Sequence, residues 1–251
     1  MLNKEVRALE THLGYEYQTA TKYQRDAMPS RRLDMSTIPD SYKEHDGPHI
    51  PLPKPNMQGG LSLWDALARR KSGRRFSEAP LSLEILGQLL WGTYGATRVA
   101  REESFFFRTA PSAGGLFPVE MYVSVHRVSS IEPGLYHYSV PRHGLTLLKE
   151  GDFGKELAAA SLGQGMLQKS AVNLIWTAVL PRTFWKYGER GIRYIYMDAG
   201  HVGQNTYLAA TALGLGCCTI GAFFDEEVNQ LLGVDGTSET TIYMASVGKS
   251  Y

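Results

Sequence analysis

The chain has 251 residues, of which 26 are Lys or Arg and 25 are Asp or Glu, so its formal net charge is +1. A chain of this length can form one large domain or two small ones. Because the charges nearly cancel without a block of like charges, neither a nucleic acid nor an anionic membrane is an expected partner. The longest apolar run, near residues 171–181, is too short to cross a bilayer, and residues 1–17 lack a targeting segment, so we expect a cytoplasmic location.

The first 60 residues differ in composition from the rest of the chain. They are rich in polar and charged groups and include a proline-rich stretch at 49–55, which favours an extended path. We expect residues 1–60 to form an arm that lies on the body or on a second subunit. Residues 61–251 are expected to form one catalytic domain.

Ser62 and Asp65 have the spacing of a capping box, which predicts a short helix beginning at residue 63. The helix leads into the run 69–75, RRKSGRR, where five cations surround Ser72 and Gly73. Cations at a helix C-terminus complement the helix dipole, whereas arginine forks around a hydroxyl suit a phosphate monoester. The run is therefore either a solvated helix end or a phosphate site.

Ser82 precedes leucines at 83, 86, 89 and 90, which predicts a second helix that ends near Gly92 or Gly95. The run that follows at 108–118, RTAPSAGGLFP, is the most informative segment of the chain. Its prolines and adjacent glycines predict a tight turn at which a ligand can approach the backbone. Alternating apolar residues after it predict a strand over 119–126 with one buried face.

The next predicted elements are strands. Segments 134–138 and 145–149 form a predicted hairpin, in which His137 and His143 are expected to be exposed rather than catalytic. The continuous apolar run 171–180 predicts a central strand.

A long helix is predicted from about residue 192 to 213. Small residues along it imply close packing of another backbone, which suits the centre of a dimer; they are Ala199, Gly200, Gly203, Ala209 and Ala210. Arg190 and Arg193 lie at its N-terminal end, where the helix dipole disfavours cations. They have either a functional role or a salt bridge to Glu189 or to the arm.

The C-terminal segment is predicted to form a strand over 217–224, a short helix capped by Asp225 that stops at Gly233, and a last strand over 240–247. Cys217 and Cys218 are adjacent, and no other thiol exists to pair with them. Because no histidine lies near them at ligand spacing, we expect both to be buried apolar side chains and expect no metal site.

Several of these segments, in this order, resemble the nitroreductase superfamily of FMN enzymes. They are RKSGRRF at 70–76, PSAGG at 111–115, ALGLG at 212–216 and IGAF at 220–223. Within that superfamily the chain is similar to the SagB-type dehydrogenases, the azoline oxidases of thiazole- and oxazole-modified peptide biosynthesis. PSAGGLFP at 111–118, GLYHY at 134–138 and KYGERGIRY at 186–194 carry this finer resemblance.

The resemblance covers residues 60–248 and implies an α+β fold. It implies a nitroreductase-like domain with a mixed, mainly antiparallel central sheet flanked by helices, and a homodimer with active sites at the interface. It also implies FMN as the cofactor. Arg70, Ser72 and Arg74 match the segment that holds the FMN phosphate and ribityl end. The loop that packs on the isoalloxazine from the other subunit is matched by Pro111, Ser112, Ala113 and Gly114. Ile220, Gly221 and Ala222 match the segment that faces the N5 and O4 edge of the ring.

Lys186 and Tyr187 match the lysine–tyrosine pair proposed as catalytic in the azoline oxidases. Aromatising an azoline needs a base that takes a proton from carbon while a hydride leaves, and a desolvated lysine is suited to this. The alternative is an ordinary solvent-facing pair before a helix. Gly115 and Phe117 stand where many nitroreductases carry an asparagine and a glutamine, which fits the SagB-type branch.

The resemblance therefore implies an FMN-dependent dehydrogenase that converts azolines to azoles in a modified peptide, beside a cyclodehydratase partner. One alternative is an NAD(P)H-dependent reductase of nitro, quinone or alkene compounds. A further alternative is a flavin-free scaffold that docks a biosynthetic partner through its arm.

Overall fold

The computed structural model describes residues 12–27, 32–100 and 105–251. Its main sheet contains β1 (His49–Pro51), β4 (Val119–Val125), β5 (Gly134–Ser139), β6 (Gly144–Glu150), β7 (Val172–Val179), β8 (Leu215–Ile220) and β9 (Glu239–Lys249). The order of these seven strands is β1-β6-β5-β4-β7-β9-β8. A separate two-stranded sheet pairs β2 (Ala96–Val99) with β3 (Phe106–Arg108).

Neighbouring strands of the main sheet are antiparallel throughout the described residues. The α+β class is thus confirmed, whereas the expectation of a mixed sheet is wrong. Short connections join β4, β5 and β6, and such connections can link only antiparallel neighbours. The predicted hairpin is β5–β6, and the predicted central strand is β7, which lies between β4 and β9.

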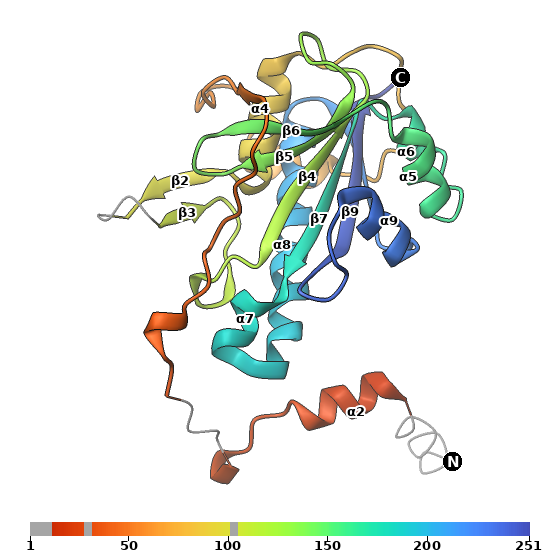
Figure 1. Ribbon diagram of the computed structural model, residues 1–251. Coiled ribbons are helices and arrows are strands. Elements are labelled where there is room, and N and C mark those ends of the chain that lie inside the picture. Colours follow the sequence, from red (N-terminus) through yellow and green to blue (C-terminus); the bar gives the residue numbers. More distant parts are fainter. Residues whose placement is uncertain (1–11, 28–31, 101–104) are drawn as a thin grey trace.

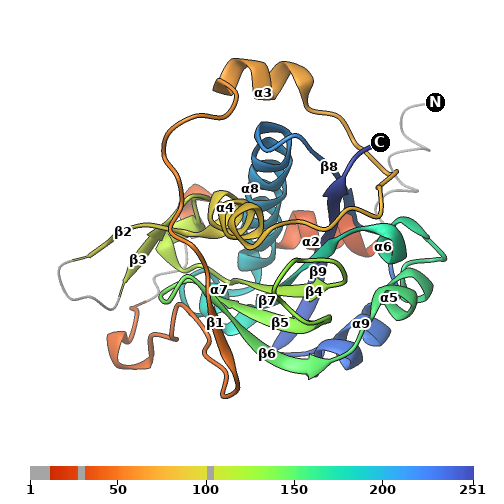
Figure 2. The same cartoon turned by 90° about the horizontal axis from the view of Figure 1, so that it is seen from above.

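Helices cover both faces of the sheet, as Figures 1 and 2 show. On one face lie α4 (Leu83–Tyr94) and the long α8 (Gly191–Ala212), and on the other lie α5 (Gly154–Ala160), α6 (Met166–Lys169) and α9 (Asp225–Leu232). The remaining helices are α2 (Leu13–Ala20), α3 (Leu63–Arg69) and α7 (Leu180–Tyr187). The structure therefore has three layers, with the sheet in the middle.

Strand β4 is buried on both faces, contrary to the expectation of one buried face. Its Met121 packs in the core that contains the α4 leucines, whereas Tyr122 packs in the core that contains α5 and α9. The polar residues of the strand are therefore covered too, and each needs a partner. Glu120, only 2% exposed, is paired with Arg182 at 2.6 Å and with His137 at 3.0 Å.

His137 is buried, so the expectation that it is exposed is wrong. Its Nε2 meets the Glu120 carboxylate across the strand pair. Burial opposes the charge of Glu120, but the hydrogen bond from His137 and the Arg182 guanidinium outweigh it and lower the pKa of Glu120 to about 2. His143 is also half-buried, and its ring contacts Tyr138 Oη and Pro53 O.

The predicted helix starts are confirmed by their hydrogen bonds. Ser62 Oγ accepts from the backbone N–H of Asp65, and Ser82 Oγ accepts from that of Ile85. The long helix and its close packing are also confirmed: a Cβ on Gly92 of α4 would lie 2.9 Å from the Ala209 side chain of α8. Cys217 and Cys218 are free and buried, as expected.

Two details near the C-terminus differ from expectation. The strand predicted over 217–224 ends at Ile220, and Phe224 rather than Asp225 occupies the N-cap of α9. Asp225 instead lies in the first helical turn, where its charge complements the dipole. Gly233 ends α9 in the left-handed conformation, as predicted.

The described parts of the arm touch the body at several separate points. Strand β1 pairs with β6 at the edge of the sheet, Lys43 pairs with Glu239 at 2.7 Å, and Ser41 O accepts from Arg108 at 2.6 Å. Helix α2 lies apart from the sheet in Figure 1. Residues 1–11 and 28–31 of the predicted arm lie outside the described residues.

Candidate functional site

The turn at 111–115 is built around two glycines in the left-handed region. Gly114 and Gly115 have φ of +66° and +68°, which glycine adopts without steric penalty. Ser112 Oγ donates to Asp198 Oδ2 at 2.6 Å, and the Ala113 N–H donates to Asp198 Oδ1 at 3.2 Å. Burial raises the pKa of Asp198, while these two hydrogen bonds oppose that rise. A buried carboxylate of α8 thus fixes the turn.

The residues that flank the turn hold its backbone. Arg108 is buried and donates to Val119 O, so its charge does not face a ligand. Arg182 donates to Phe117 O at 3.0 Å, and the Phe117 N–H donates to Ser112 Oγ at 2.9 Å. Pro111 and Gly114 remain exposed on the finished turn.

Lys186 and Tyr187, at the end of α7, meet the turn at Gly114. A Cβ placed on Gly114 would lie 2.6 Å from Tyr187 Oη and 3.0 Å from Lys186 Nζ, so only glycine leaves room for both side chains. Both are half-buried, and the Lys186 Nζ lies 5.5 Å from the centre of the Tyr187 ring. The structure thus brings the predicted pair against exposed backbone of the predicted ring-binding turn.

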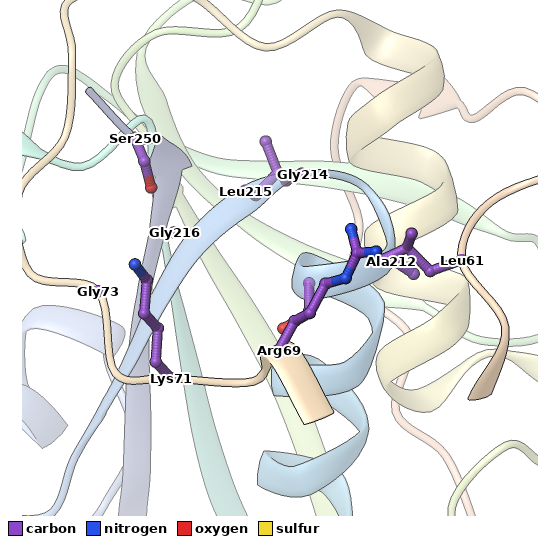
Figure 3. Close-up of a pocket in the computed structure, with 10 residues that line it drawn as sticks. Leu61, Arg69, Lys71, Gly73, Ala212, Gly214, Leu215, Gly216 and Ser250 are labelled. Carbon is purple, nitrogen blue, oxygen red and sulfur yellow. The ribbon is translucent and has the colours of Figure 1, made fainter. Parts of the chain in front are cut away.

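The cation run, which begins at the last residue of α3, divides between two groups of contacts. Arg69, Lys71 and Gly73 line a cavity of about 320 Å³, together with Leu61, Thr211, Ala212, Gly214, Leu215, Gly216 and Ser250. In Figure 3 the Lys71 side chain and the Ser250 hydroxyl point toward the space beside Gly216. Gly73 allows the segment to approach β8, because its Cβ would lie 3.3 Å from the Gly216 Cα.

Arg70 and Ser72 contact a different group, a hydroxyl network on α8 and β8. Ser72 Oγ lies 2.9 Å from Tyr207 Oη, and the Arg70 guanidinium lies 5.3 Å from the centre of the Tyr207 ring. Tyr207 Oη accepts from the Thr219 N–H at 3.0 Å, and Tyr243 Oη donates to Thr219 Oγ1 at 2.7 Å. Within the described residues, Arg70 has no carboxylate partner.

Arg74, the remaining member of the predicted phosphate set, is exposed and forms no ion pair with the described residues. Ile220 is the buried last residue of β8, and Gly221 and Ala222 are exposed directly after it. A Cβ on Gly221 would meet only the Tyr243 ring, at 3.8 Å. These positions therefore offer free charge and accessible backbone beside the hydroxyl network.

One chain does not bring all the predicted site residues together. Asp198 anchors the turn near the start of α8, and Tyr207 binds the cation segment nine residues further along. At 1.5 Å rise per residue these two points are about 13 Å apart along the helix. The turn with Lys186 and Tyr187 is thus one group, and the segment with Arg70 and Ser72 is another.

Sequence reasoning missed Asp198 and Tyr207. Asp198 is an isolated acid among small residues in the interior of a long helix, and that isolation was the available signal. Tyr207 carried no signal, because a tyrosine on an amphipathic helix is ordinary.

The described residues contain no cluster of three or more metal-ligating side chains. None of the described helices is long and apolar enough to cross a membrane.

Comparisons with known proteins agree with this fold. The family model described as the nitroreductase family matches residues 67–249. The chain is 39% identical to "Putative nitroreductase MJ1384" of Methanocaldococcus jannaschii over 189 residues, which cover 75% of this chain and 91% of that protein.

Two further similarities extend this result. Trifolitoxin-processing protein TfxB of Rhizobium leguminosarum bv. trifolii is 32% identical over 145 residues, which cover 54% of this chain and 38% of TfxB. A crystal structure of a putative nitroreductase from Anabaena variabilis superposes with a TM-score of 0.75 at 27% identity, over 94% of this chain and 47% of that one. The three-layer fold, the family match and the 39% identity together show that this chain belongs to the nitroreductase family.

Proposed function

We propose that this protein is an FMN-dependent dehydrogenase of the SagB type, which oxidises azoline rings of a modified peptide to azoles. The observation that carries the proposal is the convergence of Lys186 Nζ and Tyr187 Oη on the exposed backbone of Gly114. A base and a phenol placed together beside a glycine turn suit the removal of a proton from a substrate carbon.

The residues present fit FMN. Arg70 and Arg74 have no carboxylate partner among the described residues, and Ser72 lies between them in the sequence. A phosphate monoester dianion would satisfy both guanidinium groups. The exposed backbone at Gly114 and Gly221 would let a flat ring approach closely.

Bound there, FMN would supply a two-electron acceptor for the hydride that leaves the azoline ring. The chain's own groups provide the proton chemistry. As a ring carbon–hydrogen bond breaks, Lys186 takes the proton, and the electron pair of that bond forms the new ring double bond. Tyr187 orients the lysine and the substrate, because its hydroxyl lies at the same point above Gly114.

A homodimer completes the proposed site. In one chain the turn and the cation segment bind to different points of α8, and the resemblance implies that the turn of one copy packs on the flavin held by the cations of the other. Helices α3 and α8 each carry exposed apolar side chains that such pairing would cover, with Trp64 77% exposed and Met197 58% exposed. Exposed apolar patches of this kind mark association surfaces.

The relatives support two different substrates. TfxB is named for the processing of trifolitoxin, which favours a role in the processing of a natural product. In the proposed reaction a cyclodehydratase partner would supply the azoline. The chain covers only 38% of TfxB, whereas it covers 91% of MJ1384, which is named a putative nitroreductase and favours the reduction of nitro compounds. The two substrate classes predict different reductants for the flavin.

The test begins with the visible spectrum of the purified protein, where a flavin band is expected. Anaerobic stopped-flow mixing with a synthetic azoline peptide should bleach that band, and Lys186→Ala should abolish the bleaching. The exposed Lys155 of α5 provides the control Lys155→Ala, which should bleach normally.

Other outcomes would contradict the proposal. Bleaching by NAD(P)H but not by the azoline would assign the protein as a reductase. A protein that binds no flavin would be a scaffold. Full turnover by Lys186→Ala would remove the assigned base.

A further inference from the structure

The N-terminal segment 17–23 lies against the start of α8. In the sequence, α8 begins shortly after Lys186 and Tyr187. Tyr17 Oη donates to Glu189 O at 3.0 Å, and Thr21 is 7% exposed. Thr21 Oγ1 donates to Tyr17 O at 2.6 Å and accepts from Arg193 Nε at 2.9 Å. A segment with no apolar side chain in the core is thus fixed at this point by polar contacts.

Arg190 joins this segment to α8. One of its nitrogens donates to Thr21 O, and its Nε donates to Tyr194 Oη at 2.8 Å. Its guanidinium also lies 4.2 Å from the centre of the Tyr23 ring. Neither Arg190 nor Arg193 forms an ion pair with Glu189 or with any other described carboxylate, so the expected salt bridge is absent, and both arginines donate hydrogen bonds to the arm instead.

Tyr194 joins Arg190 to the candidate catalytic pair. The edge of its ring contacts the Tyr187 ring, with centroids 4.7 Å apart and planes at 63°. Tyr187 Oη in turn lies over Gly114. A continuous series of contacts therefore runs from Thr21 through Arg190, Tyr194 and Tyr187 to the turn.

The electrostatics of this cluster favour a fixed arrangement. Cations at the first turn of α8 oppose the helix dipole, so Arg190 and Arg193 are retained there against an electrostatic cost. The Thr21 and Gln18 carbonyls and the tyrosine rings offset that cost. Burial opposes ionisation of Tyr194, but the hydrogen bonds from Arg190 and Tyr23 and the charges of Arg190 and Arg193 lower its pKa overall.

We infer that Arg190 and Tyr194 are positioning residues for the Lys186–Tyr187 pair, and that segment 17–23 is a working part of the same site. This inference rests on the proposed function for the role of the pair. Tyr194 holds the Tyr187 ring so that its hydroxyl stays above Gly114, and Arg190 holds Tyr194. Thr21 supplies the acceptors that fix both arginines.

The first test does not depend on flavin or turnover. A spectrophotometric titration of phenol ionisation in the intact protein should show a tyrosine that ionises below the ordinary range. Tyr194→Phe should remove that tyrosine, and Arg190→Gln should shift it upward. Tyr196→Phe, at an exposed position on the same helix, is the control and should leave it in place.

The second test separates positioning from stability. Tyr194→Leu, which loses the ring contact, should lower kcat at least about tenfold with KM little changed, and Tyr194→Phe should recover most of the loss. Thr21→Val, which keeps the side-chain shape, should also lower kcat. Circular dichroism and thermal unfolding confirm that each variant is folded.

The two proposals fail in different ways. A wild-type protein without flavin-dependent azoline turnover would contradict the proposed function, whereas the phenol titration would still test the cluster. Turnover of folded Tyr194→Leu within twofold of wild type, or a titration unchanged in Tyr194→Phe, would overturn the inference.

Discussion

Replacement of Gly114 by alanine tests the central contact of the site. The residue has φ of +66°, where an alanine costs about 1–2 kcal/mol, and for a chain of this size that lowers Tm by about 2–8 °C. The new Cβ would lie 2.6 Å from Tyr187 Oη, whereas ordinary contact begins at 3.4 Å. The hydroxyl must therefore retreat by about 0.8 Å, and Lys186 Nζ, at 3.0 Å, must give way too. A displacement of this size is expected to lower turnover by about 10- to 100-fold.

Gly163→Ala is a matched control for this substitution. Gly163 has φ of +76°, and no atom lies within 4 Å of the position its Cβ would take. It should lower Tm by a similar amount and leave turnover unchanged. Differential scanning fluorimetry and flavin-reduction kinetics on both variants separate strain from displacement. If Gly114→Ala keeps the turnover of Gly163→Ala, the convergence of Lys186 and Tyr187 on this glycine has no catalytic role.

Three further outcomes are expected. Arg70→Gln should weaken FMN binding at least about tenfold in a fluorescence titration, whereas Lys71→Gln should leave the affinity unchanged. The reverse result would place the phosphate in the cavity lined by Lys71. Met197→Glu should shift the protein to a monomer in light scattering and reduce bound flavin, whereas Leu162→Glu, at an equally exposed position, should do neither. Burial, with the charges of neighbouring groups, lowers the pKa of His45 to about 4. Between pH 6.5 and 4 this histidine therefore binds a proton in the unfolded chain but not in the folded one. Stability is lost as pH falls through that window, by about 2 kcal/mol after screening, and His45→Gln should flatten the slope in urea unfolding.

Local signals in the sequence predicted the starts of α3 and α4 and the end of α9. The caps at Ser62 and Ser82 and the stop at Gly233 depend on hydrogen bonds and backbone angles within a few residues, so short patterns contain them. The burial of both faces of β4 depends on distant partners. In the sequence Glu120 of β4 has the pattern of a solvent-facing position, but its charge is buried and paired with Arg182 of α7.

In the candidate site, too, some features are encoded by local sequence and others depend on residues far apart in the chain. The glycine turn was readable from its composition, and the Lys186–Tyr187 pair was found through family resemblance. The contact of that pair with Gly114 joins segments about 70 residues apart, which no local pattern encodes. Asp198 binds Ser112 across a sequence separation of 86, and only the folded helix reveals that partnership.

The division of the cation run into two groups of contacts changes how substitutions there should be judged. Arg69, the last residue of α3, and Lys71 line the cavity, whereas Arg70 and Ser72 contact Tyr207. Swapping an arginine for a lysine keeps each charge in its group. Inserting a single uncharged residue after Arg70 would move Lys71 and Ser72 relative to Arg69 and Arg70 while leaving the net charge the same. For this segment the position of each cation along the chain, more than the number of cations, decides which ligand the protein can hold.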